Sequence, residues 1–574
     1  MTVLATYAIS LYLLVSYFSA WEHVRMVCAV LVLMATVEAG WGMSQQVWGG
    51  ALRPSGTFFN PNFLAGYLVA MAVFVAGVVS VRRARRVPWG WAGSAMLATV
   101  LAGAALATGS RGAVLALAAG AILVLGLRHR LKGVAAVLAL LGCVALLPNP
   151  VSERLRAEHR ANPLSYARIQ VWMGAMKDLL DHPMGIGLGL YQYVYPLHPA
   201  AIEGQITRYG RTAQNAHNEY LQIGVEVGVL GLIVFLWGVA ALGCEARSLL
   251  RRRLRRLHRG VIIGASGGVT TILVHAMVDA NLHEPALAML LACLAAVILS
   301  ARQWATHDPY EACGLSITAP RWRLVTSCAG VGLVCVAVMA VTSVGLAWDA
   351  HETGTKAAAQ QDYPRAVEAY RSAIALDPGK ALYHSSLAAA HYQTFIRTNQ
   401  RAAAEASLAE LKIAVALNPL DGRLPALLGM VYGRLAGLSG PARSTTGGGL
   451  SSEQSAWVRA AKSAYESALI REPFSPFYRL ELARLTLVER NHRGAEVILR
   501  ELLHREPNFL PARSLLAKVL MVQGQETQAE EEYREVLSRR QQFAHWTKDA
   551  LERQYLDVDA ARLAADLHRG PAGV

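Results

Sequence analysis

The pattern of apolar and polar positions divides the chain into two parts. Residues 1–346 read as one apolar run after another, whereas residues 347–574 read as polar, alanine-rich amphipathic helix. A helix that crosses a bilayer needs about 20 apolar residues. The runs that approach this length are 3–19, 26–43, 63–81, 89–107, 112–127, 131–147, 225–244, 260–278, 285–301 and 324–346. We therefore predict a polytopic transmembrane helical bundle of about ten spans over 1–346.

Repeated helix endings mark the second part. In four places an apolar helical run is followed by an acidic or amide residue and then by proline: Asp377-Pro378, Asn418-Pro419, Glu472-Pro473 and Glu506-Pro507. Pro473 and Pro507 lie 34 residues apart, which is the tetratricopeptide period. We predict a soluble α-solenoid of such repeats over 347–574, so the whole chain is expected to be all-α. A solenoid offers a concave surface that can bind a protein partner, and the sequence does not identify that partner.

Composition supports a membrane protein and excludes several other classes. Of 574 residues, 54% are hydrophobic and only 17% are charged, against about 25% charged residues in soluble domains. A uniformly soluble enzyme, a disordered chain and a disulfide scaffold are therefore excluded. The net charge of +15 comes largely from arginines between the apolar runs, so we expect contact with membrane lipids and no nucleic acid partner.

The same arginines orient the predicted spans. The basic loops 82–88, 128–132, 245–259 and 302–323 are expected in the cytoplasm. Alternation then puts the long loop 148–224 and everything after residue 347 outside the cytoplasm, which in a bacterium means beyond the inner membrane. It also puts Met1 outside, which is unusual and leaves open whether further spans precede it.

Cysteine and histidine spacing gives no indication of a metal or cofactor. The seven cysteines include no CxxC pair, and no HExxH occurs. His275 and Asp279, with His283 and Glu284 nearby, allow either a metal site or a polar contact across helices, and the spacing favours the second. We expect no metal and no cofactor.

Two short segments on the external side are candidates for chemistry. Residues 53–63, with Asn60 and Asn62, form a turn-rich entry to a span, which serves either as helix caps or as the lining of a polar cavity. Arg111, in Thr108-Gly109-Ser110-Arg111-Gly112, either reaches the membrane interface or meets an anion there.

The long loop gathers further charged side chains. Arg168 lies on a helix-compatible stretch, and Arg208, Arg211 and His217 follow it, with Asn218 and Glu219 entering the next span. Guanidinium binds diphosphate through two parallel hydrogen bonds and stays charged. Histidine can accept the proton of a hydroxyl near neutral pH, although a lone histidine before a span is more often interfacial.

These features together resemble the O-antigen ligase and O-antigen polymerase superfamily of bacterial membrane glycosyltransferases. The resemblance covers roughly residues 50–300. It rests on Gly56-Thr57-Phe58-Phe59-Asn60-Pro61-Asn62, Thr108-Gly109-Ser110-Arg111-Gly112, Arg168-Ile169-Gln170-Val171-Trp172, His182-Pro183-Met184-Gly185-Ile186-Gly187-Leu188-Gly189, Ala216-His217-Asn218-Glu219-Tyr220, and His275 with Asp279. The order and spacing of these segments make the set specific.

The resemblance implies a substrate class and a catalytic set. Members move a glycan from an undecaprenyl diphosphate carrier to an acceptor in the periplasm, without a metal and with external arginine and histidine side chains. By motif match those side chains are Arg111, Arg168 and His217. The substrate-binding residues are expected to be Arg208, Arg211, Asn60, Asn62, Asn218, Glu219, His275 and Asp279, with Glu219 as a rival base.

Several functions remain open from the sequence. Ligase-type transfer to lipid A core or another cell-surface acceptor is favoured over polymerisation of lipid-linked repeat units and over protein glycosylation. A catalytically inactive membrane anchor, whose repeats assemble an export machine, is the alternative from another class. Typical family members have about twelve spans. The tetratricopeptide extension is not part of the ligase type, although chains that carry it occur in the superfamily. We expect the chemistry of the loop to be independent of the repeats.

Overall fold

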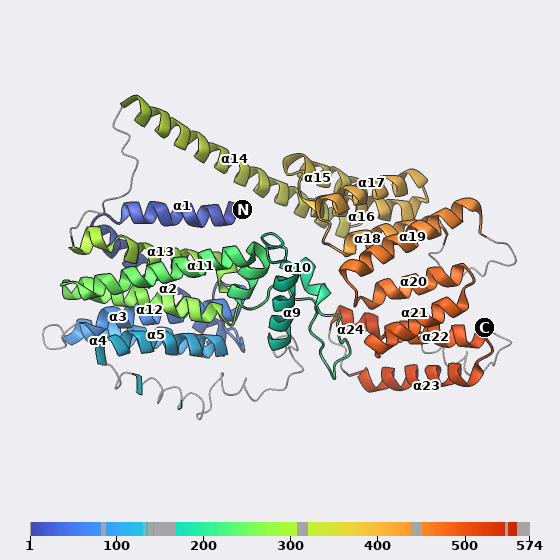
Figure 1. Cartoon of the computed structure of the whole chain (residues 1–574), viewed down its shortest axis with the longest axis horizontal. Coiled ribbons are helices and arrows are strands. Elements are labelled where there is room, and N and C mark those ends of the chain that lie inside the picture. The colour runs from blue at the N-terminus through green and yellow to red at the C-terminus, as the bar shows by residue number, and fades with distance from the viewer. Residues whose placement is uncertain are drawn as a thin grey trace. The chain divides into compact units, whose positions relative to one another are not determined.

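The computed structural model describes residues 2–81, 88–129, 134–135, 142, 168–306, 320–437, 450–545 and 549–559 (Figure 1). These residues form helices and turns, and none of them forms a β-strand. The all-α prediction is confirmed. The chain divides into two compact units: Met1–Tyr191 with Gln214–Ser316, and Gln192–Ala213 with Ile317–Val574.

The first unit contains the apolar helices that precede residue 302. They are α1 (Thr2–Tyr17), α2 (Trp21–Val47), α3 (Pro61–Ser80), α4 (Pro88–Ala107), α5 (Arg111–His129), α11 (Glu219–Arg251), α12 (Arg256–Ala276) and α13 (Pro285–Leu299), with the shorter α9 (Arg168–Asp181) between α5 and α11. Each of the predicted spans before residue 302 falls on one of these helices, except 131–147. That span lies almost wholly outside the described residues, as do most of the basic loops 82–88 and 302–323 and residues 148–167 of the long loop.

Length and hydropathy identify membrane-crossing candidates among the described helices. Five are long and apolar enough to cross a bilayer: Trp21–Val47, Pro61–Ser80, Glu219–Arg251, Arg256–Ala276 and Pro285–Thr306. Shorter apolar helices cover Thr6–Tyr17, Ala92–Ala107 and Arg111–Leu127. A membrane protein is therefore supported, while the number of about ten spans stays a prediction.

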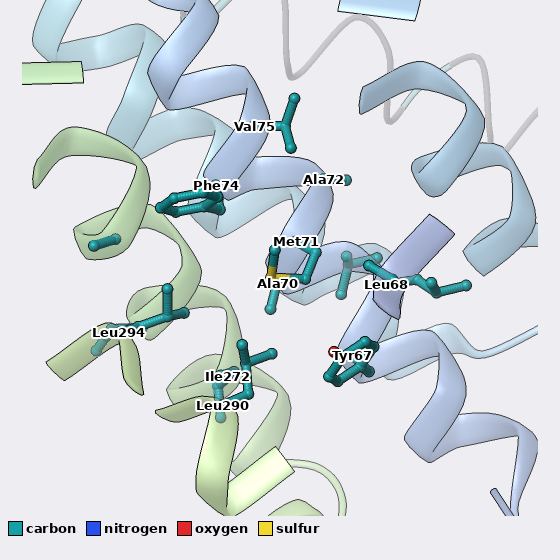
Figure 2. Close-up of a cluster of buried hydrophobic side chains, with 14 of the residues drawn as sticks. Tyr67, Leu68, Ala70, Met71, Ala72, Phe74, Val75, Ile272, Leu290 and Leu294 are labelled. Carbon is teal, nitrogen blue, oxygen red and sulfur yellow. The ribbon is translucent and has the colours of Figure 1, made fainter. Parts of the chain in front are cut away.

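Helix α3 forms the centre of the first unit. Nearly all its side chains are buried, because α4, α5, α12 and α13 pack around it. Figure 2 shows Met71 and Phe74 of α3 among Ile272 of α12 and Leu290 and Leu294 of α13. A helix that is apolar all round is expected in such a position.

Glycines allow α3 and α12 to approach closely. A Cβ atom on Gly264 would lie 2.4 Å from the carbonyl oxygen of Phe74, and one on Gly77 would lie 2.4 Å from the Cα of Gly264. Small residues at helix crossings are typical of membrane bundles, where van der Waals packing drives association. This contact fixes the position of α12, whose C-terminal end leads into residues of the candidate site.

The second unit is a stack of helix pairs. Its helices are α14 (Pro320–Ala359), α15 (Tyr363–Leu376), α16 (Ala381–Thr398), α17 (Arg401–Leu417), α18 (Arg423–Leu435), α19 (Ser452–Arg471), α20 (Pro476–Val488), α21 (His492–Arg505), α22 (Leu510–Val522), α23 (Glu526–Phe543) and α24 (Ala550–Tyr555). The four predicted endings are confirmed: α15, α17, α19 and α21 stop just before Asp377, Asn418, Glu472 and Glu506. Proline disfavours helical geometry in the residue before it, which explains the shared stop.

Helix α14 runs without a break through the predicted domain boundary. It contains the predicted span 324–346 and continues to Ala359. Ala347 packs with Ala373 and Tyr383, and Ala357 packs with Tyr370, so the last turns of α14 belong to the first repeat. The boundary between 346 and 347 stays a prediction, and one continuous helix crosses it.

The close approach at Gly264 generates a stability prediction. Gly264→Val should lower the thermal midpoint of the detergent-solubilised protein, because overpacking of a tight contact costs about 1–3 kcal/mol. Gly238→Val on α11 is the control, since a Cβ atom there meets nothing within 4 Å. Equal midpoints for the two variants, measured by scanning fluorimetry, would contradict this account of the helix crossing.

Candidate functional site

Asp279 joins three distant segments of the first unit. It follows the C-terminus of α12, and its side chain is only 4% exposed. One carboxylate oxygen, Oδ2, accepts a hydrogen bond of 2.7 Å from Asn62 Nδ2 and lies 3.6 Å from Arg168 Nη2. The other, Oδ1, lies 3.2 Å from His217 Nδ1. Asp279 therefore brings together residues from α3, α9 and the approach to α11.

The electrostatics of Asp279 determine which nitrogen of His217 can act as a base. Burial by itself would raise the pKa of Asp279, but the hydrogen bond from His217 and the charge of Arg168 outweigh burial and hold that pKa below its usual range. Asp279 is thus a carboxylate at neutral pH and accepts Nδ1–H of the imidazole. Nε2 is then the nitrogen that can take up a proton.

Asn62 is positioned by a network that includes two predicted motifs. The side chain of Asn60 caps α3 by accepting the backbone N–H of Asn62 at 2.9 Å. Arg53 donates from Nη2 to Asn62 Oδ1 at 2.9 Å and from Nε to the carbonyl of Thr108 at 2.7 Å. The segment 53–63 therefore acts through a helix cap and an arginine bridge, and its Asn62 side chain reaches Asp279.

Arg111 begins α5 at the same end of the helical bundle. A Cβ atom on the next residue, Gly112, would lie 2.8 Å from the His275 ring and 2.9 Å from Val278. The carbonyl of Val278 accepts a hydrogen bond from Arg168. The N-terminus of α5 thus packs against the segment that holds Arg168, and a helix N-terminus favours anions.

His217 has a backbone conformation that is uncommon outside glycine. Its φ is 51°, in the left-handed region, where histidine is tolerated better than most residues. The backbone N–H of Ala216 donates to Gln222 Oε1 at 2.7 Å, and Asn218 caps α11 by accepting the N–H groups of Tyr220 and Leu221. These bonds hold His217 on both sides. Its side chain is 34% exposed and remains open to a ligand.

Glu219 is engaged in a different contact. Its side chain is 2% exposed, and its Oε1 accepts from the backbone N–H of Leu282 at 2.6 Å and lies 3.1 Å from His283 Nδ1. Burial would lower the pKa of His283, but the hydrogen bond with Glu219 outweighs it and raises that pKa. Glu219 therefore fixes the turn after Asp279. No sequence signal paired Glu219 with His283.

The glycine-rich segment 185–189 packs against α11 at a kink in that helix. Gly228 has φ 83°, and this break frees the carbonyls of Val225 and Glu226, which accept the N–H groups of Ile186 and Gly187 at 3.0 and 2.9 Å. The Glu226 carboxylate accepts the N–H of Gly189 at 2.9 Å. Buried backbone groups thereby find partners. This docking fixes the chain between α9 and α11, a role for Glu226 that the sequence did not reveal.

His275 is placed inside the bundle and not at a surface. Its side chain is fully buried between Gly66 of α3 and Gly112 of α5, where added Cβ atoms would lie 2.7 and 2.8 Å from the ring. Among the described residues neither ring nitrogen has a hydrogen-bond partner. Its position suits packing behind Asp279 better than direct contact with a substrate.

Arg208 and Arg211 belong to the second unit. The backbone N–H groups of Arg208 and Tyr209 donate to the Glu506 carboxylate at 2.9 and 2.7 Å. The Arg208 side chain pairs with Glu203, and Arg211 pairs with Asp549 and Glu552 at 3.0 and 2.6 Å. The structure therefore does not gather these two arginines in one unit with Arg168 and His217.

Residues 192–213 of the loop fold together with the repeats. Ile206 is buried in a cluster with Phe509 and Tyr555, and Glu506 is 1% exposed. The pKa of Glu506 is raised by burial, although its bonds to the loop backbone oppose this shift. The backbone and apolar side chains of this segment have their partners in the repeat helices. The expectation that the chemistry of the loop is independent of the repeats concerns activity and stays a prediction.

Family models match both parts of the chain. Residues 96–236 match the O-antigen ligase family, and residues 356–394 and 486–551 match two tetratricopeptide repeat families. The chain carries an O-antigen ligase domain followed by tetratricopeptide repeats. The ligase match includes Arg111, Arg168 and His217, and the family supports a membrane glycosyltransferase-like role.

Solved tetratricopeptide-type structures match about a third of this chain. The MamA protein is 15% identical, with 36% of this chain and 97% of that chain covered and a TM-score of 0.28. A thermophilic tetratricopeptide protein of Thermus thermophilus is 18% identical, with 35% and 98% covered and a TM-score of 0.25. No curated protein matches this chain.

The contact between Glu506 and the loop generates a second prediction. Glu506→Ala should speed amide hydrogen exchange at residues 206–209 about tenfold or more, because each buried N–H left without an acceptor costs about 1–3 kcal/mol. Glu530→Ala on α23 is the matched control, since that exposed carboxylate pairs only with Arg534 among the described residues. Unchanged exchange at 206–209 in Glu506→Ala would refute the docking.

Proposed function

We propose that this protein transfers a glycan from an undecaprenyl diphosphate carrier to an acceptor hydroxyl outside the cytoplasm, as a ligase acting on lipid A core or another cell-surface acceptor. The observation that supports this most directly is the meeting of His217, Arg168 and Asn62 on the single buried carboxylate of Asp279. An inactive scaffold has no need for a buried carboxylate that orients a partly exposed imidazole.

The proposed reaction needs a base and a stabilised leaving group. The acceptor oxygen attacks the anomeric carbon, its proton passes to His217 Nε2, and the bond from that carbon to the carrier diphosphate breaks. Asp279 stabilises the imidazolium that forms, since it already accepts from Nδ1. The electron pair of the broken bond stays on the diphosphate. Atoms and charges balance without a metal, and we propose that none is required.

Arg168 and Arg111 are proposed to bind the diphosphate. Arg168 is held by the Val278 carbonyl and lies 3.6 Å from Asp279, a separation at which the guanidinium retains donors for a second anion. Arg111 would approach from the N-terminus of α5, whose dipole adds to its charge. Guanidinium groups suit a leaving group that gains charge as the bond breaks.

The surface of α9 suits a lipid-linked donor. Four apolar side chains of this helix are exposed and recur at helical spacing: Ile169, Met173, Met176 and Leu180. This apolar face begins one residue after Arg168. A cation at the head of an apolar stripe matches a diphosphate attached to a hydrocarbon chain.

Transfer by purified protein in lipid nanodiscs tests the assignment. His217→Ala should lower turnover about 10²–10⁴-fold, the usual contribution of a general base. Asp279→Asn should lower it through loss of the imidazole orientation, and Arg168→Lys should be poorly active because an ammonium does not reproduce the two-pronged contact. His182→Ala, another histidine of the loop, is the control and should retain turnover.

One outcome would change the proposed base, a second would change the type of transfer, and a third would contradict the proposed enzymatic function. Near-normal transfer by His217→Ala, together with a folded but inactive Glu219→Gln, would make Glu219 the base. Products that lengthen by repeat units on a lipid-linked acceptor would assign polymerisation in place of ligation. Complete absence of transfer by the wild-type chain with either acceptor would favour the scaffold.

The proposed location outside the cytoplasm has its own test. An alkaline phosphatase fused after Ala359, the last residue of α14, should be highly active, because the arginine-rich loops orient the spans. A fluorescent reporter that matures only in the cytoplasm, fused at the same position, is the paired control and should stay dark. Strong fluorescence with an inactive phosphatase would reverse the orientation.

A further inference from the structure

The second unit contains a cavity that the ligase-type chemistry does not explain. Its volume is about 270 Å³. One wall is the loop segment, including Tyr209 and Arg211, and the other is formed by the repeats, including Arg423, Phe474 and Tyr478. We propose that this cavity binds a sugar unit of an uncharged glycan, the acceptor or the transferred chain. The inference rests on the proposed function and deepens it.

The cavity has the composition that sugar binding needs. Rings of tyrosine and phenylalanine offer apolar surfaces to the C–H faces of a sugar, and hydroxyl and charged groups offer hydrogen bonds to its hydroxyls. Tyr209 of the loop and Phe474 of the repeats pack together with ring centroids 4.5 Å apart. Glu472 lies in the same lining and is hydrogen-bonded by Tyr478.

Charge compensation disfavours an anionic ligand. Arg423 makes two hydrogen bonds to Asp421, at 2.8 and 2.7 Å, and Arg211 is paired with Asp549 and Glu552. The guanidinium groups of the cavity are therefore already neutralised, in contrast to what a diphosphate or a phosphorylated peptide requires. An uncharged ligand rich in hydroxyls can use their remaining donors without displacing a carboxylate.

The position of the cavity in the sequence connects it with the candidate chemistry. Its loop wall lies in the segment between Arg168 and His217, and Thr212 of the lining precedes His217 by five residues. A glycan held by this segment would be held by the same loop that carries the proposed base. The repeats then contribute to acceptor or product selection by completing a binding site, a role distinct from recruiting a protein.

Binding to the full chain in nanodiscs tests the proposal. The probe is a set of defined, uncharged oligosaccharides, titrated by calorimetry. Tyr209→Leu and Phe474→Leu should each weaken binding about tenfold, because each removes a ring face. Tyr209→Phe and Phe474→Tyr keep the rings and should bind within about threefold of wild type. Tyr363→Leu, on α15 outside the lining, is the control and should bind normally.

The outcomes separate this proposal from the proposed function. Binding that is equal in wild type, Tyr209→Leu and Phe474→Leu, with all three folded by circular dichroism, would overturn the cavity assignment even if transfer is observed. Inorganic diphosphate or an acidic peptide that binds with ring dependence, while the oligosaccharides do not, would overturn it as well. Ring-dependent oligosaccharide binding without any transfer would refute the proposed function and leave the cavity assignment standing.

Discussion

The candidate site depends on one buried carboxylate. Asp279 lies shortly after a candidate membrane helix, and its low exposure would be costly without partners for both of its oxygens. Asn62, His217 and Arg168 supply those partners. The requirement to satisfy this charge therefore couples the start of α3, the start of α9 and the turn before α11. Loss of Asp279 would therefore remove a contact from each of three segments, and not one contact alone.

The helices around Asp279 can hold it because they approach so closely. Gly264 allows α12 to contact α3, and Gly66 and Gly112 leave room for the buried ring of His275. Farther along the chain, the kink at Gly228 opens backbone acceptors that bind the glycine-rich segment 185–189. Glycine at these positions allows close helix packing and backbone hydrogen bonds. These close backbone contacts hold the polar residues of the site in position.

The long loop serves two units. Its ends carry Arg168 and His217 in the first unit, whereas its middle, 192–213, is held by Glu506 and by the apolar cluster around Ile206 in the second. Glu472 and Glu506 precede the prolines that stop repeat helices, yet both also face this loop segment. These two acidic residues at the ends of repeat helices thus also contact or face the loop segment 192–213.

The sequence by itself determined the helical class, the helix positions and the repeat endings, because apolar periodicity and proline act locally. It also identified His217 and Asp279 as candidates, through the motifs that resemble O-antigen ligases. Only the tertiary structure decided that these two meet. Asn62 and Asp279 are separated by 217 positions, and the pairing of Glu219 with His283 likewise follows from folding at long range. A local pattern cannot specify the partner of a buried charge, because that partner is set by how whole helices pack.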